Sequence, residues 1–182
     1  MLFTEYNNNY SLKVSQLASP DELNTGLWLC LIGTHEIPPH IALINDAKYY
    51  SVTTNRIKVG EPIEKILKAI SRKTLPTVFV SIKPGKNVGD ILEESFKAYP
   101  TLGNGEHSCL SPISEFFAKI YSSEFGSQHL VFDALSLAEK NKMLVECKSL
   151  FIDKLDNGVL HLPKYTHAQI RHKINSILKI NE

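Results

Sequence analysis

The chain has 182 residues, of which 43% are hydrophobic and 21% are charged. This length and composition are typical of a single globular domain with a substantial core, and they argue against disorder. The 20 basic residues nearly balance the 19 acidic ones, which leaves a net charge of +1. A chain this close to neutral lacks the basic excess that binding to nucleic acid requires, so we expect no nucleic-acid partner.

The longest apolar run, residues 27–33, is far too short to cross a bilayer, and we therefore expect no membrane span. The first residues show no basic segment followed by an apolar stretch, so no secretory signal is predicted. The three cysteines, Cys30, Cys109 and Cys147, lack the spacing of a disulfide framework or of a metal site. These features favour a reducing, cytoplasmic setting, and they imply neither a metal nor a cofactor.

The first third of the chain has the pattern of β-strands. Residues 10–14 alternate polar with apolar side chains, and residues 26–33 form a continuous apolar run typical of a central strand that is buried on both faces. Residues 40–44 and 48–54 are two further strands, and the turn composition of residues 45–47 predicts that they form a hairpin.

Helices become more frequent after residue 60. Glu61-Pro62 predicts a helix start, followed by an apolar stripe formed by Ile63, Ile66, Leu67 and Ile70. A β-branched strand over 76–82 follows, and Asp90 with Glu93 has the spacing of a capping box for a helix that runs to residue 99. A loop over 101–106 then leads to Cys109, which opens an amphipathic helix.

The last third predicts a strand over 129–132, a mostly helical stretch over 135–151, and a final helix that a capping box of Thr166 and Gln169 begins. We therefore expect an α+β fold in one domain, with a small antiparallel sheet packed against helices. Its core would span about 10–135 and a helical C-terminal extension about 136–182.

Cys109 is the strongest candidate for a reactive group. A helix N-terminus carries unpaired N–H groups and the positive end of the helix dipole, which stabilise a thiolate. A cysteine hydrolase also needs a base and a group that orients the base. His40, at the start of a rigid strand, is the candidate base. Ser51 is the candidate orienting group, because it lies on the neighbouring strand on the face that it shares with Tyr49 and Thr53.

This order of parts resembles the circularly permuted papain-like proteins of the NlpC/P60 superfamily, which include the lecithin:retinol acyltransferase-like enzymes. The resemblance covers roughly residues 28–121. It rests on His40 opening the strand His-Ile-Ala-Leu-Ile, on the hairpin to Lys-Tyr-Tyr-Ser-Val, and on Cys109 at a helix start. It implies a permuted papain-like fold with catalytic Cys109, His40 and Ser51. It also implies cleavage or acyl transfer at an amide or ester bond of a small-molecule, peptide or lipid-like substrate.

Each of these residues also has a structural interpretation. A lone cysteine is most often inert core, and Cys30 in an apolar strand and Cys147 on a predicted helix are interpreted in this way. His107 is a second candidate base. Trp28, Tyr49 and His107 form the predicted substrate-binding set, although the first two residues are also typical of a core. His35 and His40 do not form a helical metal motif, because Pro38-Pro39 forbids a helix between them.

Two other function classes stay open at this point. A non-catalytic module that binds a ligand or a protein would show the same elements with a poorly oriented Cys–His pair. A subunit of a larger assembly would offer an exposed apolar patch on the C-terminal helices to a protein partner.

Overall fold

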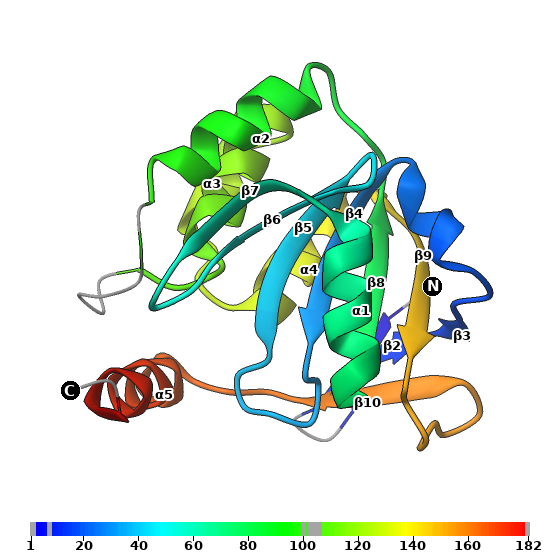
Figure 1. The fold of residues 1–182 in the computed structure, drawn as a ribbon. Helices are drawn as coiled ribbons and strands as arrows, with labels where there is room; N and C mark the ends of the chain where they lie inside the picture. The colour runs from blue at the N-terminus through cyan, green and yellow to red at the C-terminus, as the bar shows by residue number, and fades with distance from the viewer. Residues whose placement is uncertain (1–2, 7–8, 100, 102–106, 181–182) are drawn as a thin grey trace.

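The computed structural model describes residues 3–6, 9–99, 101 and 107–180, so the predicted loop over 102–106 lies outside the described residues (Figure 1). A seven-stranded sheet forms the centre of the fold. Its strands pair antiparallel, except for the parallel pair β3–β9 at one edge. In spatial order the strands are β3 (Ser15–Gln16), β9 (Leu144–Leu150), β8 (Thr77–Ile82), β4 (Leu27–Ile32), β5 (His40–Asn45), β6 (Lys48–Val52) and β7 (Ile57–Pro62).

A second, three-stranded antiparallel sheet consists of β1 (Phe3–Tyr6), β2 (Asn9–Lys13) and β10 (Val159–Pro163). The described α-helices are α1 (Ile63–Lys73), α2 (Val88–Lys97), α3 (Ser111–Ile120), α4 (Val131–Lys140) and α5 (His167–Ile180). Two short 3-10 helices, η1 (Pro20–Asn24) and η2 (Ser123–Ser127), complete the elements. The α+β class is confirmed, with a mostly antiparallel sheet. None of the helices in the described part of the chain combines the length and the apolar composition that a membrane span needs.

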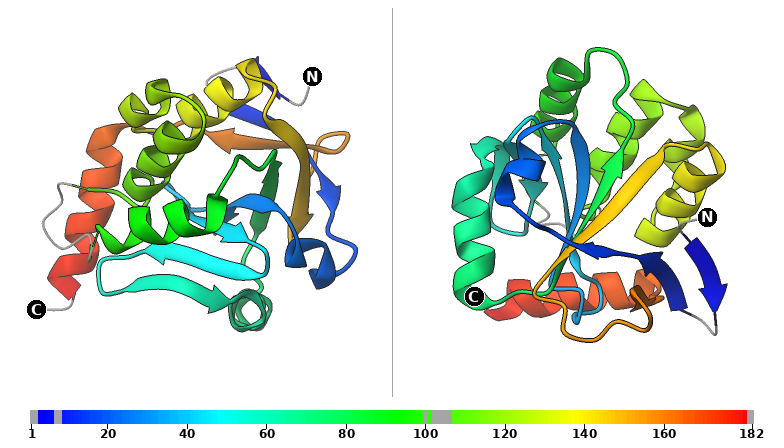
Figure 2. Two further views of the ribbon diagram at one scale, coloured as in Figure 1. Left: turned by 90° about the horizontal axis from the view of Figure 1, so that it is seen from above. Right: turned by 90° about the vertical axis from the view of Figure 1, so that its right-hand side faces the viewer.

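The main sheet lies between two helical layers, with α1 on one face and α2, α3 and α4 on the other (Figures 1 and 2). The central strand β4 is buried on both faces because its alternate side chains enter different cores. Leu27, Leu29 and Leu31 pack on the side of α2, α3 and α4, whereas Trp28 and Cys30 pack on the side of α1. This arrangement confirms the predicted central strand.

The predicted hairpin is present, and it positions His40. Strands β5 and β6 pair from Leu43 opposite Tyr50 to Asn45 opposite Lys48. The turn residues Asp46 and Ala47 both have positive φ, at 46° and 63°, which matches the turn that the twist of a two-residue hairpin favours.

A β-bulge interrupts the pairing of β6 with β7. Tyr49 lies opposite Glu61 and Ser51 lies opposite Lys58, so β7 has one more residue than β6 between these two pairs. Gly60 lies within this segment with a φ of 69°, a conformation that glycine adopts without steric cost. Because of the extra residue, Lys58 and Glu61 both stand on the face of Tyr49 and Ser51.

The C-terminal third differs from the prediction. The predicted strand over 129–132 is the approach to and first turn of α4, and the second half of the predicted helix over 135–151 is strand β9. Strand β9 lies between β8 and β3, so Cys147 is a buried strand residue and the region after residue 135 completes the main sheet. Only α5 remains as a helical appendage. It begins with the predicted capping box, since the Thr166 N–H donates to Gln169 Oε1 over 2.8 Å.

The predicted capping box of α2 does not form. The helix begins at Val88, and Asn87 precedes it in the left-handed conformation without a side-chain cap. Asp90 and Glu93 therefore lie inside the helix, where Glu93 pairs with Lys97 over 2.9 Å.

Candidate functional site

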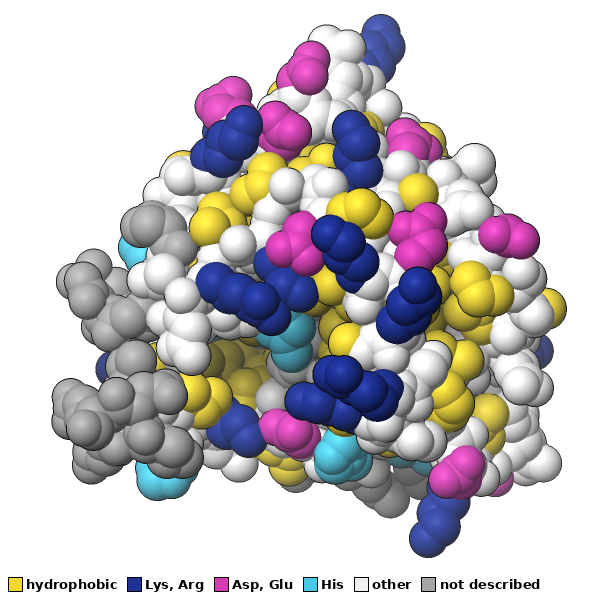
Figure 3. Space-filling view, in the orientation of Figure 1, with side chains coloured by type: hydrophobic (Ala, Val, Ile, Leu, Met, Phe, Trp, Pro, Cys, Tyr) yellow, Lys and Arg dark blue, Asp and Glu magenta, His cyan; other side chains and the backbone are white. Residues whose placement is uncertain are grey.

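Cys109 and His40 line the same cavity, which has a volume of about 200 Å³. We call it the catalytic cavity after the roles that the sequence led us to expect for these two residues. Its walls come from the loop before β5, from the turn between β6 and β7, and from α5. In the space-filling view, a hollow floored by hydrophobic side chains opens between that turn and α5 (Figure 3). The residues that complete the lining are Glu36, Pro38, Pro39, Val52, Thr53, Thr54, Ser108, Ile170, Lys173, Ile174 and Ile177. The structure thus brings together a thiol and an imidazole that are far apart in the sequence.

Cys109 lies just ahead of α3, as predicted, in a turn that hydroxyl groups stabilise. Ser108 Oγ accepts the Leu110 N–H over 3.2 Å, and Ser111 Oγ accepts the Ser108 N–H over 3.0 Å. Burial raises the pKa of the Cys109 thiol, while the N–H groups of Ile41, of Cys109 itself and of Leu110 oppose that rise. Burial prevails, so the resting side chain at neutral pH is a thiol.

His40 is also uncharged at neutral pH. Burial lowers its pKa from 6.5 to about 4, and the charge of Lys58 lowers it further in the same direction. The Lys58 ammonium stands 5.5 Å from the ring centroid of Tyr49, on the same side of the sheet. The Cys–His pair at rest is therefore neutral, which differs from the thiolate that the sequence led us to expect.

The hydrogen bond to the imidazole comes from Tyr49, whose hydroxyl lies 3.3 Å from His40 Nε2. We had expected this bond from Ser51. The Ser51 Oγ is buried and makes no hydrogen bond of ordinary geometry within the described residues, although Ser51 is among the neighbours that oppose the burial-driven rise in the pKa of Tyr49. Tyr49, and not Ser51, therefore makes the side-chain contact with the imidazole. The alternation of the strand identified the correct face, but the long phenol reaches the imidazole where the short serine does not.

The other predicted substrate-binding residues lie in different places. Trp28 belongs to the core under α1 and donates its indole N–H to the Thr25 carbonyl over 2.9 Å, and it is not among the described residues that line the catalytic cavity. Tyr49 is nearly fully buried, and its hydroxyl hydrogen-bonds to the His40 imidazole. His107 stacks edge-on against Tyr99 and lines a neighbouring cavity. Sequence reasoning missed the residues of α5, because nothing in their pattern shows which part of the fold the helix covers.

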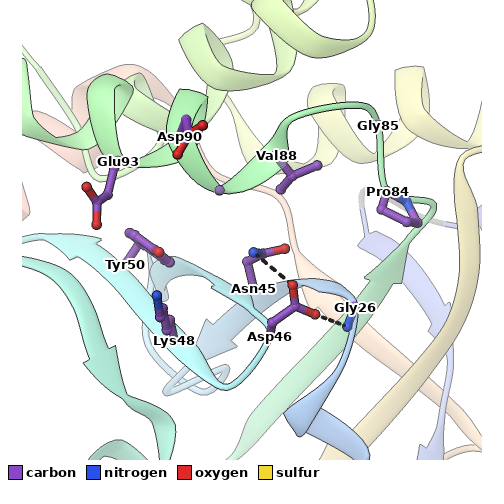
Figure 4. Close-up of a pocket in the computed structure, with 11 residues that line it drawn as sticks. Gly26, Asn45, Asp46, Lys48, Tyr50, Pro84, Gly85, Val88, Asp90 and Glu93 are labelled. Atoms are coloured by element: carbon purple, nitrogen blue, oxygen red, sulfur yellow. Dashed lines mark hydrogen bonds between the residues drawn. The ribbon is translucent and has the colours of Figure 1, made fainter.

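A separate cavity of about 580 Å³ lies between the hairpin turn and α2 (Figure 4). Two of the three carboxylates that line it are engaged in the fold. Asp46 accepts hydrogen bonds from the Gly26 N–H and from the Asn45 side chain, and Glu93 pairs with Lys97. The described residues that line it include no cysteine, histidine, serine or threonine. The catalytic cavity is therefore the better candidate for chemistry.

The described residues include no group of three or more histidine, cysteine or carboxylate side chains that is arranged to hold a metal ion. Comparison with known proteins finds no match to this chain among protein-family models, curated proteins or solved structures.

Proposed function

We propose that the protein is a thiol-dependent hydrolase or acyltransferase that acts on an amide or ester bond, with Cys109 as nucleophile and His40 as base. The observation that carries the proposal is the cavity that both side chains line. The order of His40 on β5, the hairpin and Cys109 ahead of α3 supports a permuted papain-like relationship as part of the same proposal. Three free cysteines agree with a reducing, cytoplasmic compartment.

The Tyr49 contact determines which nitrogen of His40 can act. A neutral imidazole has one N–H and one lone pair. If Nε2 donates to the Tyr49 oxygen, Nδ1 keeps its lone pair and can accept the thiol proton. The phenol must then direct its own proton elsewhere, and the buried Ser51 Oγ, a hydrogen-bonding neighbour of Tyr49, can accept it. Tyr49 and Ser51 would together hold His40 in the tautomer that the reaction needs.

In the reaction that we propose, Cys109 Sγ attacks the substrate carbonyl carbon while its proton passes to His40 Nδ1. The N–H groups at the start of α3 stabilise the oxyanion that forms. The C–O or C–N bond then breaks, and the proton moves from His40 to the departing oxygen or nitrogen. Water, or an acceptor hydroxyl or amine, attacks the thioester and releases the thiol. The substrate is a small molecule, a peptide or a lipid-like compound.

Acylation by p-nitrophenyl butyrate, followed by intact mass and peptide mapping, tests the proposal. We expect one butyryl group on Cys109, no adduct in Cys109→Ser, and acylation slowed by about 100-fold in His40→Ala, since a positioned base contributes about that much. His107→Ala is the matched control, because it removes a nearby imidazole that does not line the catalytic cavity. Equal acylation rates for the wild-type protein and His40→Ala would show that the pair is not catalytic.

A non-catalytic binding module is the second candidate, and one observation favours it. The pKa of Cys109 is raised while that of His40 is lowered, and both changes act against proton transfer from the thiol to the imidazole. A protein that binds ligands in the same cavity would show no acyl adduct on Cys109 in the experiment above.

A further inference from the structure

A second cavity adjoins the catalytic one beside Ser108, the residue before Cys109. It has a volume of about 580 Å³ and lies between the start of α3, the start of α4 and α5. We call it the histidine cavity, because His107, His129 and His167 line it. The two cavities share Ser108, Ile170 and Ile174. A molecule whose reacting carbonyl lies at Cys109 can therefore extend into both.

The polar side chains of the described residues that line the histidine cavity can all donate hydrogen bonds. Arg171 is permanently cationic, and each imidazole offers at least one N–H. The hydroxyls of Ser108 and Ser111 accept backbone N–H bonds, which leaves their own hydrogens free to point into the cavity. Among the described residues that line it, there is no aspartate or glutamate. Such a set of donors is complementary to an anion.

Two further features agree with this chemistry. The rings of His129 and His167 lie 5.6 Å apart and edge to face, so they form one wall of the cavity. The start of α3 adds the positive end of a ten-residue helix. A metal ion is the alternative occupant for a histidine cluster, but the described histidines do not come together in a group that could hold one.

We propose that the histidine cavity binds an anionic group of the substrate, a carboxylate or a phosphate, while the catalytic cavity receives an apolar group on the other side of the scissile bond. This inference rests on the proposed function. The preferred substrate would then be an acidic amide or ester, and Arg171 would be a specificity-determining residue.

Two thiosulfonate reagents that differ only in the charge of their tail test the proposal. The sulfonatoethyl reagent is anionic and the trimethylammonioethyl reagent is cationic, and both form a disulfide with the Cys109 thiol and release methanesulfinate. Cys30 and Cys147 are buried, and Cys109→Ala measures any reaction with them. We expect the anionic reagent to react faster with the full-length protein. In Arg171→Met the ratio of the two rate constants should fall about fivefold, as expected for one charge several ångströms away.

Lys68→Met is the matched control. It removes an exposed cation from α1, and Lys68 lines neither of the two cavities. Its ratio should stay within about twofold of the wild-type ratio. An unchanged ratio in Arg171→Met would overturn the proposal. Protection of Cys109 by inorganic phosphate or by acetate would support it and show which anion the cavity prefers, whereas protection by neither would count against it.

The outcome is separable from that of the proposed function. His40→Ala should change the rates of both reagents by the same factor, so their ratio reports only on the anion site. A ratio that responds to Arg171→Met in a protein that forms no acyl adduct would leave the anion site in place and remove the catalytic reaction.

Discussion

Acidification should destabilise the protein through His40. In the unfolded chain the imidazole binds a proton with a pKa of about 6.5, whereas in the folded protein its pKa is about 4 because of burial and of Lys58. Between these two values the unfolded chain binds more protons than the folded one, so stability falls as the pH falls. The loss begins near pH 6.5 and is complete below pH 4, where it reaches about 3 kcal/mol.

At pH 4.5 the same relation gives a loss of about 2.5 kcal/mol relative to pH 7.5. Urea unfolding at both pH values measures this loss for the wild-type protein and for His40→Gln, which keeps a polar side chain that does not titrate. The other titratable groups contribute equally to both proteins, so the difference between their pH dependences isolates His40. NMR titration of the imidazole gives its pKa directly. Parallel pH dependences, or a His40 resonance that titrates near pH 6.5, would refute the reasoning.

Three further outcomes follow from the structure. Tyr49→Phe removes the hydroxyl at the imidazole, so acylation by p-nitrophenyl butyrate should slow by about tenfold, and urea unfolding should show a stability lower by about 1 kcal/mol. Equal acylation rates in the two proteins would exclude an orienting role for Tyr49. Lys173→Glu breaks the ion pair between α5 and Glu36, so alkylation of the Cys109 thiol by iodoacetamide should quicken about threefold. Adding Glu36→Lys swaps the two charges and should restore the original rate. An unchanged rate in Lys173→Glu would show that other contacts alone hold α5. Gly85→Ala places a Cβ against an isoleucine side chain of α3 and should lower the stability by about 1–2 kcal/mol in thermal unfolding. Gly89→Ala places its Cβ in open space on α2 and should raise the stability by about 0.5–1 kcal/mol. Equal shifts for the two variants would contradict this explanation.

The elements that the sequence predicts correctly are those with a strong local signal. The apolar run of β4, the turn at Asp46 and the stripe of α1 each specify their structure through neighbouring residues. The placement of His40 at the start of β5 and of Cys109 just ahead of α3 also follows from local signals, whereas their meeting in one cavity depends on how the chain folds between them.

The elements that the sequence does not predict depend on distant partners. Apolar and polar residues alternate less regularly in the sequence of β9 than in a strand with one exposed face. The strand forms because β8 and β3 flank it. The choice of Tyr49 over Ser51 depends on side-chain reach across the sheet, which the pleat does not encode. The position of α5 over the catalytic cavity depends on the course of the chain after β10. The residues of the helix itself do not indicate that course.

The bulge at Gly60 links the number of residues in the edge strand β7 to the protonation of His40, which lies two strands away on β5. Without the extra residue in β7, Lys58 would turn to the opposite face of the sheet, away from the ring of Tyr49 and from Glu61, with which it pairs over 3.7 Å. The imidazole of His40 would then lose the cation that helps to keep it unprotonated. A chain shortened by that one glycine could keep the same arrangement of strands and still contain a histidine that titrates closer to neutral pH. Burial sets most of the proton affinity of the proposed base, but strand register contributes to it through Lys58, so changes in β7 would alter it without any substitution in the catalytic cavity.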